Sequence, residues 1–116
     1  MSETLSDEPV ITVEELESLC FSDAPPVLIN TLPAAAHRAK HIPGSINVPL
    51  GDLDLIERIV PNKDTFIVVY CANGSCPTSE KATEALQEKG YTNVRDFEGG
   101  YAAWRRAGHP LVGENA

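Results

Sequence analysis

The sequence predicts an α/β domain with a central, mainly parallel sheet of four or five strands and helices on both faces of the sheet. The run of consecutive apolar residues at 66–70 is typical of a strand buried on both faces. A second short apolar segment lies at 27–30, and segments with apolar residues at helical spacing separate such runs. A chain of 116 residues is near the usual size of one domain of this kind.

The composition is ordinary for a globular protein, with 42% apolar and 22% charged residues. The formal net charge of −8 argues against nucleic acid and anionic membranes as partners, because both are negatively charged. No apolar run approaches the roughly 18 residues of a membrane span. Residues 1–8 are acidic and polar, unlike a secretory signal or a transit peptide, so we expect a cytoplasmic protein.

The sequence has three cysteines, an odd number that suggests no disulfide framework. We therefore expect free thiols in a reducing compartment.

The chain divides into three expected parts. We expect a flexible acidic tail at 1–8, one domain at 9–113 and a C-terminal tail at 114–116.

The first predicted helix begins after Thr12. Thr12 and Glu15 have the spacing of a capping box, and Ile11 can pack on Leu16 as a hydrophobic staple. The apolar face of the helix comprises Val13, Leu16, Leu19 and Cys20. We therefore interpret Cys20 as a core residue rather than a redox-active one.

The middle of the chain alternates predicted strands and short helices. A strand at 27–30 precedes a short helix at 34–40. A Pro-Gly turn and an extended segment follow within 41–49, and apolar spacing predicts a helix at 52–60.

A small group of basic residues, His37, Arg38 and His41, lies in this region. Carboxylate or cysteine ligands at fixed spacing are missing beside them, so we predict no metal site and interpret the histidines as surface or capping residues.

The last third of the chain adds a helix at 79–89 that ends at Gly90, and a strand at 94–97. The buried stripe of that helix comprises Ala82, Ala85 and Leu86. A final helix follows Gly99 and Gly100 and ends at Gly108, with Tyr101 and Trp104 on its core face.

The loop after the central strand carries the chemistry. Cys71 stands at the carboxyl end of that strand, where open α/β sheets bind ligands. Asn73 and Gly74 both tolerate positive φ, which predicts a tight turn. Backbone N–H groups of such a loop point inward and form an anion-binding nest.

The helix after the loop strengthens this prediction. Thr78 or Ser79 can cap it, and Pro77 costs no helical hydrogen bond at that position. The positive end of the helix dipole then faces the loop. A thiol at Cys71 should have a pKa below the usual value of about 8.5 and act as a nucleophile. The alternative is a buried, inert structural cysteine.

Three ordered motifs surround this loop, at 41–49 (HIPGSINVP), 90–95 (GYTNVR) and 98–104 (EGGYAAW). Together with the loop they make the chain, from about residue 10 to residue 112, resemble single-domain rhodanese-like proteins. The resemblance implies the three-layer rhodanese-like fold and a sulfurtransferase in which Cys71 receives sulfane sulfur as a persulfide. It implies a small donor such as thiosulfate or a persulfide, a thiol acceptor, which can be a protein, or cyanide, and no cofactor.

The chain departs from the pattern of that family at two places. The active loop of the family commonly has arginine and then Ser or Thr at the positions of Cys76 and Pro77. Without arginine, thiosulfate affinity should suffer, and phosphatase or arsenate-reductase activity is disfavoured. The first strand of the family usually ends with Asp, a hydrophobe and Arg, where this chain has Asn30, Thr31 and Leu32. An acid and a base that could pair are thus lost together.

The predicted catalytic residue is Cys71. The predicted substrate-binding residues are Ala72, Asn73, Gly74, Ser75, Cys76, Thr78 and Ser79. A further hypothesis is that Cys76 attacks a persulfide on Cys71, releasing sulfide and leaving a disulfide. The favoured alternative is that Cys76 is a small apolar residue packed at the helix start.

Two other functions stay open at this point. One is a non-catalytic binding or regulatory module with the same fold, which the departures at Asn30, Leu32 and Cys76 would suit. The other is a thiol–disulfide redox protein that uses Cys71 and Cys76, although their spacing is wider than Cys-x-x-Cys.

Overall fold

The computed structural model describes residues 10–75 and 77–116. In this part of the chain, four strands form one parallel sheet in the order β2-β1-β3-β4. The strands are β1 (Val27–Asn30), β2 (Ile46–Asn47), β3 (Ile67–Tyr70) and β4 (Val94–Phe97). The predicted α/β class, the parallel sheet and its central strand are confirmed.

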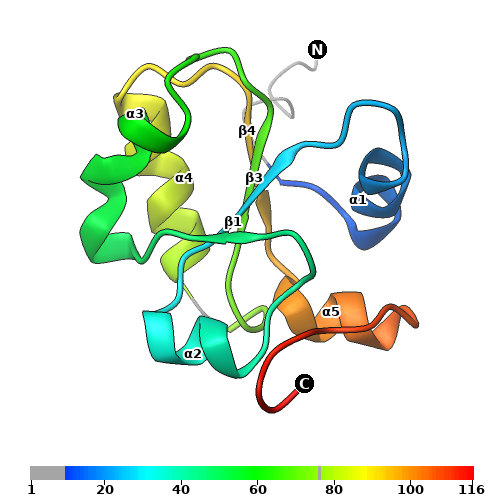
Figure 1. Cartoon of the computed structure of the whole chain (residues 1–116). Helices are drawn as coiled ribbons and strands as arrows, with labels where there is room; N and C mark the ends of the chain where they lie inside the picture. Colours follow the sequence, from blue (N-terminus) through cyan, green and yellow to red (C-terminus); the bar gives the residue numbers. More distant parts are fainter. Residues whose placement is uncertain (1–9, 76) are drawn as a thin grey trace.

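Helices cover both faces of the sheet (Figure 1). One face packs against the 3₁₀ helix η2 (Leu50–Leu55), α3 (Ile56–Ile59) and α4 (Thr78–Glu88), and the other against α1 (Val13–Cys20) and α5 (Gly100–Arg106). The short helix α2 (Ala34–Ala39) follows β1 at the edge where the strands end. The expected three layers are therefore present.

The side chains of β3 alternate between two cores. Ile67 and Val69 belong to the core under η2, α3 and α4, whereas Val68 and Tyr70 belong to the core under α1 and α5. All four side chains are fully buried. Burial on both faces explains why this strand is apolar at every position instead of alternating.

Local signals placed α1 correctly. Thr12 Oγ1 accepts the backbone N–H of Glu15 at 3.1 Å, and Glu15 Oε1 accepts that of Thr12 at 2.9 Å, which completes the capping box. Cys20 packs against the core as predicted, and burial raises the pKa of its thiol.

The predicted helix at 52–60 is wrong in its form. A 3₁₀ helix runs to Leu55 and the α-helix covers only Ile56–Ile59. Asp52 has non-helical backbone angles (φ −108°, ψ 18°), which put a kink inside the 3₁₀ segment. The apolar spacing nevertheless identified buried residues, because Leu53 in the 3₁₀ helix and Ile56 in the α-helix are both buried.

Both ends of the described chain are attached to the domain. Ile11 donates its N–H to the carbonyl of Asp96 at 3.1 Å. Glu114 and Asn115, in the predicted C-terminal tail, donate to carbonyls at the end of α2. The predicted tail at 1–8 lies outside the described residues. None of the described helices has the length and apolar character to cross a membrane.

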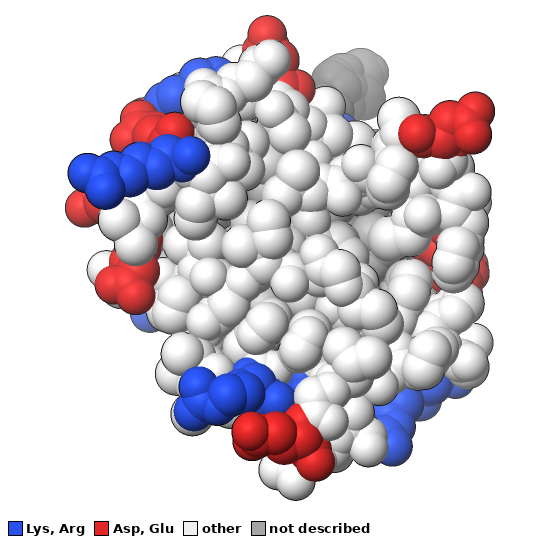
Figure 2. All heavy atoms as spheres, viewed as in Figure 1, with Lys and Arg blue, Asp and Glu red and all other residues white. Residues whose placement is uncertain are grey.

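Charged side chains lie around the rim of the face drawn in Figure 2, and its centre is uncharged. Among the described residues on this face, Lys and Arg form small separate groups, several of them beside Asp or Glu. On this face the described residues therefore do not form the continuous basic surface that a nucleic-acid backbone requires.

Candidate active site

Cys71 directly follows β3, at the carboxyl edge of the sheet. Its side chain is fully buried. The Sγ atom lies 3.7 Å from Ser79 Oγ and 3.9 Å from the carbonyl oxygen of Asn73, close enough for weak S–H hydrogen bonds. The thiol thus faces the first turn of α4, as the strand–loop–helix pattern predicted.

The predicted tight turn follows Cys71. It forms without positive φ at Asn73 or Gly74, because among the described residues only other glycines have positive φ. The side chain of Asn73 accepts the backbone N–H of Ser75 at 2.9 Å. This Asx turn closes the loop. It also occupies one of the N–H groups of the predicted anion nest.

The capping prediction for α4 is also wrong. The helix begins at Thr78, and Pro77 stands at the N-cap without a side-chain hydrogen bond. The hydroxyl groups point elsewhere, because Thr78 Oγ1 lies 3.2 Å from Thr31 Oγ1 and Ser79 Oγ contacts Cys71. The positive end of the helix still faces the loop.

Thr31 is a structural partner of the site that the sequence did not identify. It stands directly after β1, and its hydroxyl donates to the carbonyl of Tyr70 at 3.1 Å besides contacting Thr78. The neighbouring Asn30 is buried, and its Oδ1 accepts the N–H of Leu32 at 2.9 Å. At the three positions where the resemblance implies an acid, a hydrophobe and a base, the chain therefore has an amide, a hydroxyl and an apolar side chain.

The start of α5 holds the first residues of the loop. Tyr101 and Ala102 donate their N–H groups to the carbonyls of Cys71 and Ala72, at 3.1 and 3.0 Å. Gly100 permits this close approach. Its φ is +64°, and a Cβ there would lie 2.6 Å from the carbonyl oxygen of Cys71. The motif at 98–104 thus positions the cysteine loop.

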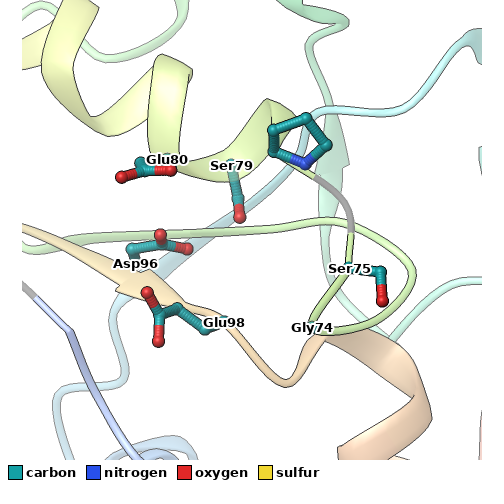
Figure 3. A pocket seen from close by; sticks show the side chains of 7 residues that line it. Gly74, Ser75, Ser79, Glu80, Asp96 and Glu98 are labelled. Atoms are coloured by element: carbon teal, nitrogen blue, oxygen red, sulfur yellow. The ribbon is translucent and has the colours of Figure 1, made fainter.

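An acidic cavity of about 270 Å³ lies beside the loop, between α4 and the end of β4 (Figure 3). Its lining residues are Gly74, Ser75, Pro77, Ser79, Glu80, Asp96 and Glu98. Ser79 is common to the cavity and to the contact with Cys71, so the cavity adjoins the thiol.

Asp96 is the buried acid of this cavity, with 3% of its surface exposed. Burial raises its pKa from 3.8 to about 6, a hydrogen bond from Ser79 opposes the rise, and the charges of Glu98 and Glu80 add to it. Its Oδ1 atom is buried without a hydrogen-bond partner. The sequence motifs did not single out Asp96, although one acid in the strand at Val94–Phe97 was a usable signal.

The structure brings most of the predicted site residues together. Ala72, Asn73, Gly74 and Ser75 form the turn after Cys71, and Thr78 and Ser79 form the first turn of α4. Cys76 lies outside the described residues. Its predicted roles, in binding and as a resolving or redox partner of Cys71, therefore stay predictions.

Comparisons with known proteins identify the family. The rhodanese-like domain family matches residues 12–107. A sulfurtransferase of Allochromatium vinosum is 31% identical over 105 residues, which cover 86% of this chain and 95% of that protein. The HTH-type transcriptional regulator Rv0324 of Mycobacterium tuberculosis is 32% identical over 85 residues, which cover 72% of this chain and 36% of the regulator.

A solved structure agrees with these matches. The rhodanese-like domain of the Anabaena Alr3790 protein superposes with a TM-score of 0.81 at 26% identity, over 93% of this chain and 81% of that one. Several other relatives are much longer proteins, and the chain spans about a quarter of their length. The match over most of the chain, together with the fold and the cysteine loop, shows that the protein belongs to the rhodanese-like domain family.

Proposed function

We propose that the protein is a sulfurtransferase or sulfur carrier that holds sulfane sulfur as a persulfide on Cys71. The observation that carries this proposal is the position of Cys71, at the end of the central strand with its sulfur facing the first turn of α4. Relatives named sulfurtransferases support the reaction class.

In the first step, the thiolate of Cys71 attacks the terminal sulfur of a donor persulfide. The Sγ–S bond forms, the S–S bond of the donor breaks, and the donor leaves as a thiolate with the electron pair of that bond. The positive end of α4 favours the anionic sulfur. Because Cys71 is fully buried, residues 72–75 must shift to admit the donor.

In the second step, an acceptor thiolate attacks the terminal sulfur of the Cys71 persulfide. The new S–S bond forms on the acceptor and Cys71 leaves as a thiolate, so no net oxidation occurs over the cycle. Cyanide as the acceptor would give thiocyanate. The acceptor thiol can belong to a small molecule or to a protein. A reducing compartment such as the cytoplasm keeps the thiol available between cycles.

We expect thiosulfate to be a poor donor. Among residues 71–79 no side chain is Arg or Lys, and the adjoining cavity is acidic. A doubly charged anion therefore lacks the guanidinium group that would bind it, and must approach carboxylates.

Intact-mass analysis tests the proposal. The wild type and Cys71→Ser are each incubated with thiosulfate, glutathione persulfide or 3-mercaptopyruvate. We expect one added sulfur on the wild type only, with a low yield from thiosulfate. Cys20→Ser is the control, because Cys20 packs in the core under α1, and it should take up sulfur normally. Uptake of one sulfur atom by Cys71→Ser would refute Cys71 as the residue that carries the persulfide.

A non-catalytic regulatory module is the second candidate. The complete burial of Cys71 and the similarity to a transcriptional regulator favour it. Iodoacetamide at neutral pH separates the two functions. An unreactive Cys71 in the folded protein, with no sulfur uptake from any donor, would support the module.

A further inference from the structure

We propose that the acidic cavity beside Cys71 is a subsite for a positively charged group of the substrate, an ammonium or guanidinium group carried close to the reacting sulfur. This inference rests on the proposed function, because it names the substrate class that the same site selects.

The position of the cavity relates it to the thiol. Ser79 contributes to its wall and contacts Cys71 Sγ at 3.7 Å. Gly74 and Ser75, from the turn that follows Cys71, form part of the same wall. A substrate whose sulfur reaches Cys71 can therefore place a group a few atoms away in the cavity.

The charge of the cavity sets the sign of that group. Glu80, Asp96 and Glu98 line it, and none of the described lining residues is Lys or Arg. Figure 3 shows the acids at one end, with Asp96 directed from β4 toward Ser79 and Glu98 beside it. Three carboxylates around one small space attract a cation and repel an anion.

Asp96 supplies a reason for the cavity to be occupied. Its Oδ1 atom is buried without a partner, although buried carboxylate oxygens normally accept hydrogen bonds. A cationic donor in the cavity would satisfy this atom once the carboxylate rotates to present it to the cavity. Its pKa of about 6 leaves Asp96 mainly ionised at neutral pH, and a bound cation would stabilise that form further.

An organic cation fits better than a metal ion. Among the described residues, no three His, Cys, Asp or Glu side chains are grouped closely enough to hold a metal. The three carboxylates are therefore too far apart to share one metal ion, which suits a group with several N–H donors. The volume of about 270 Å³ is slightly below the usual range of ligand pockets, about 300–1,000 Å³, so a side-chain-sized group fits and a nucleotide does not.

The first test measures the local charge at Cys71 without requiring sulfur transfer. Cationic, neutral and anionic methanethiosulfonate reagents are reacted with a variant in which Cys71 is the only cysteine (Cys20→Ser and Cys76→Ser). We expect the cationic reagent to react faster than the anionic one. Glu98→Gln should lower the cationic-to-anionic rate ratio about fivefold, because one exposed carboxylate near the thiol is removed.

Glu84→Gln is the matched control for that test. Glu84 is exposed on α4 and lies outside the cavity, so this variant makes the same change in net charge elsewhere. Its rate ratio should equal that of the parent. Equal effects of Glu98→Gln and Glu84→Gln, or no preference for the cationic reagent, would overturn the subsite.

The second test measures acceptor choice. Protein with a persulfide on Cys71 transfers sulfur to cysteamine, 2-mercaptoethanol or mercaptoacetate. We expect Glu98→Gln to lower the kcat/KM for cysteamine about fivefold relative to that for 2-mercaptoethanol. An unchanged ratio would overturn the subsite. If no persulfide forms on Cys71 at all, the proposed function fails, and the reagent series still decides on the cavity.

Discussion

At the scale of single residues, the site connects a thiol to a buried carboxylate through one hydroxyl group. Cys71 Sγ contacts Ser79 Oγ, and Ser79 in turn hydrogen-bonds Asp96. Ser79 is itself 2% exposed, so its side chain is almost completely buried. The protonation state of Asp96 can therefore affect both the stability of the domain and the charge near the thiol.

Asp96 should make the domain less stable as pH rises. Its pKa is about 6 in the folded chain and about 3.8 when unfolded, so between these values the folded state holds the proton that the unfolded state has lost. The contribution of Asp96 to the free energy of unfolding is fully present below about pH 3.8 and is lost as the pH rises through about 6. The difference in pKa corresponds to about 3 kcal/mol.

Asp96→Asn measures this contribution. We subtract the free energy of unfolding of the wild type from that of the variant. This difference should increase by about 2–3 kcal/mol from pH 4 to pH 8. Urea titrations at several pH values give this difference. A difference that stays constant with pH would show that Asp96 does not titrate between the two states in this range.

The candidate site was predictable only where it is local in sequence. Cys71 and the hydroxyl residues Thr78 and Ser79 follow one strand, and the sequence pattern placed all of them at one edge of the sheet. Asp96 joins them from β4, through the parallel pairing of Val69 with Asp96. That register depends on tertiary packing, which no local pattern specifies.

At the scale of elements, two helices hold the cysteine loop from opposite sides. The first turn of α4 faces the thiol, and the first turn of α5 binds the carbonyls of Cys71 and Ala72. Gly100 is the contact point on α5, because the backbone of the loop occupies the space where a side chain would be.

Gly100→Ala should therefore destabilise the domain more than Gly108→Ala. Both residues have positive φ, +64° and +99°, and an alanine in that region costs about 1–2 kcal/mol. At Gly108 a Cβ would meet nothing within 4 Å, whereas at Gly100 it would overlap the backbone of Ala72. We expect Gly100→Ala to cost at least about 2 kcal/mol more.

Thermal or urea unfolding of the two variants checks this expectation, and iodoacetamide labelling of Cys71 checks the loop. The Gly100→Ala thiol should become more reactive, since the loop loses its support from α5. Equal losses of stability in the two variants would mean that the loop can shift away from α5 without cost.

The starts of α1 and α4 show that a helix cap can be predicted only when its hydrogen bonds are local in the sequence. The capping box of α1 lies within four residues, and it was predicted correctly. The cap of α4 was not, because Thr78 instead contacts Thr31, which is 47 residues away in the sequence. Competing tertiary hydrogen bonds of this kind override a local preference.

At the scale of the whole molecule, the negative charge of the chain and the acids of the cavity act in the same direction. The formal net charge is −8, and the described cavity beside the thiol has three carboxylates. The parallel sheet was predictable from one strand that is apolar throughout, whereas this electrostatic environment needed the tertiary structure. Both contributions oppose the approach of anionic donors.

Salt should therefore accelerate the uptake of sulfur from thiosulfate. Raising KCl from about 0.02 M to about 0.5 M shortens the Debye length from about 20 Å to about 4 Å, which screens the repulsion between the protein and the dianion. We expect the rate of uptake to rise about fivefold. Dividing it by the rate of alkylation with uncharged iodoacetamide removes any effect of salt on the thiol itself. A rate that falls as salt is added would show that a local cationic group draws thiosulfate to Cys71 and outweighs the field of the rest of the molecule.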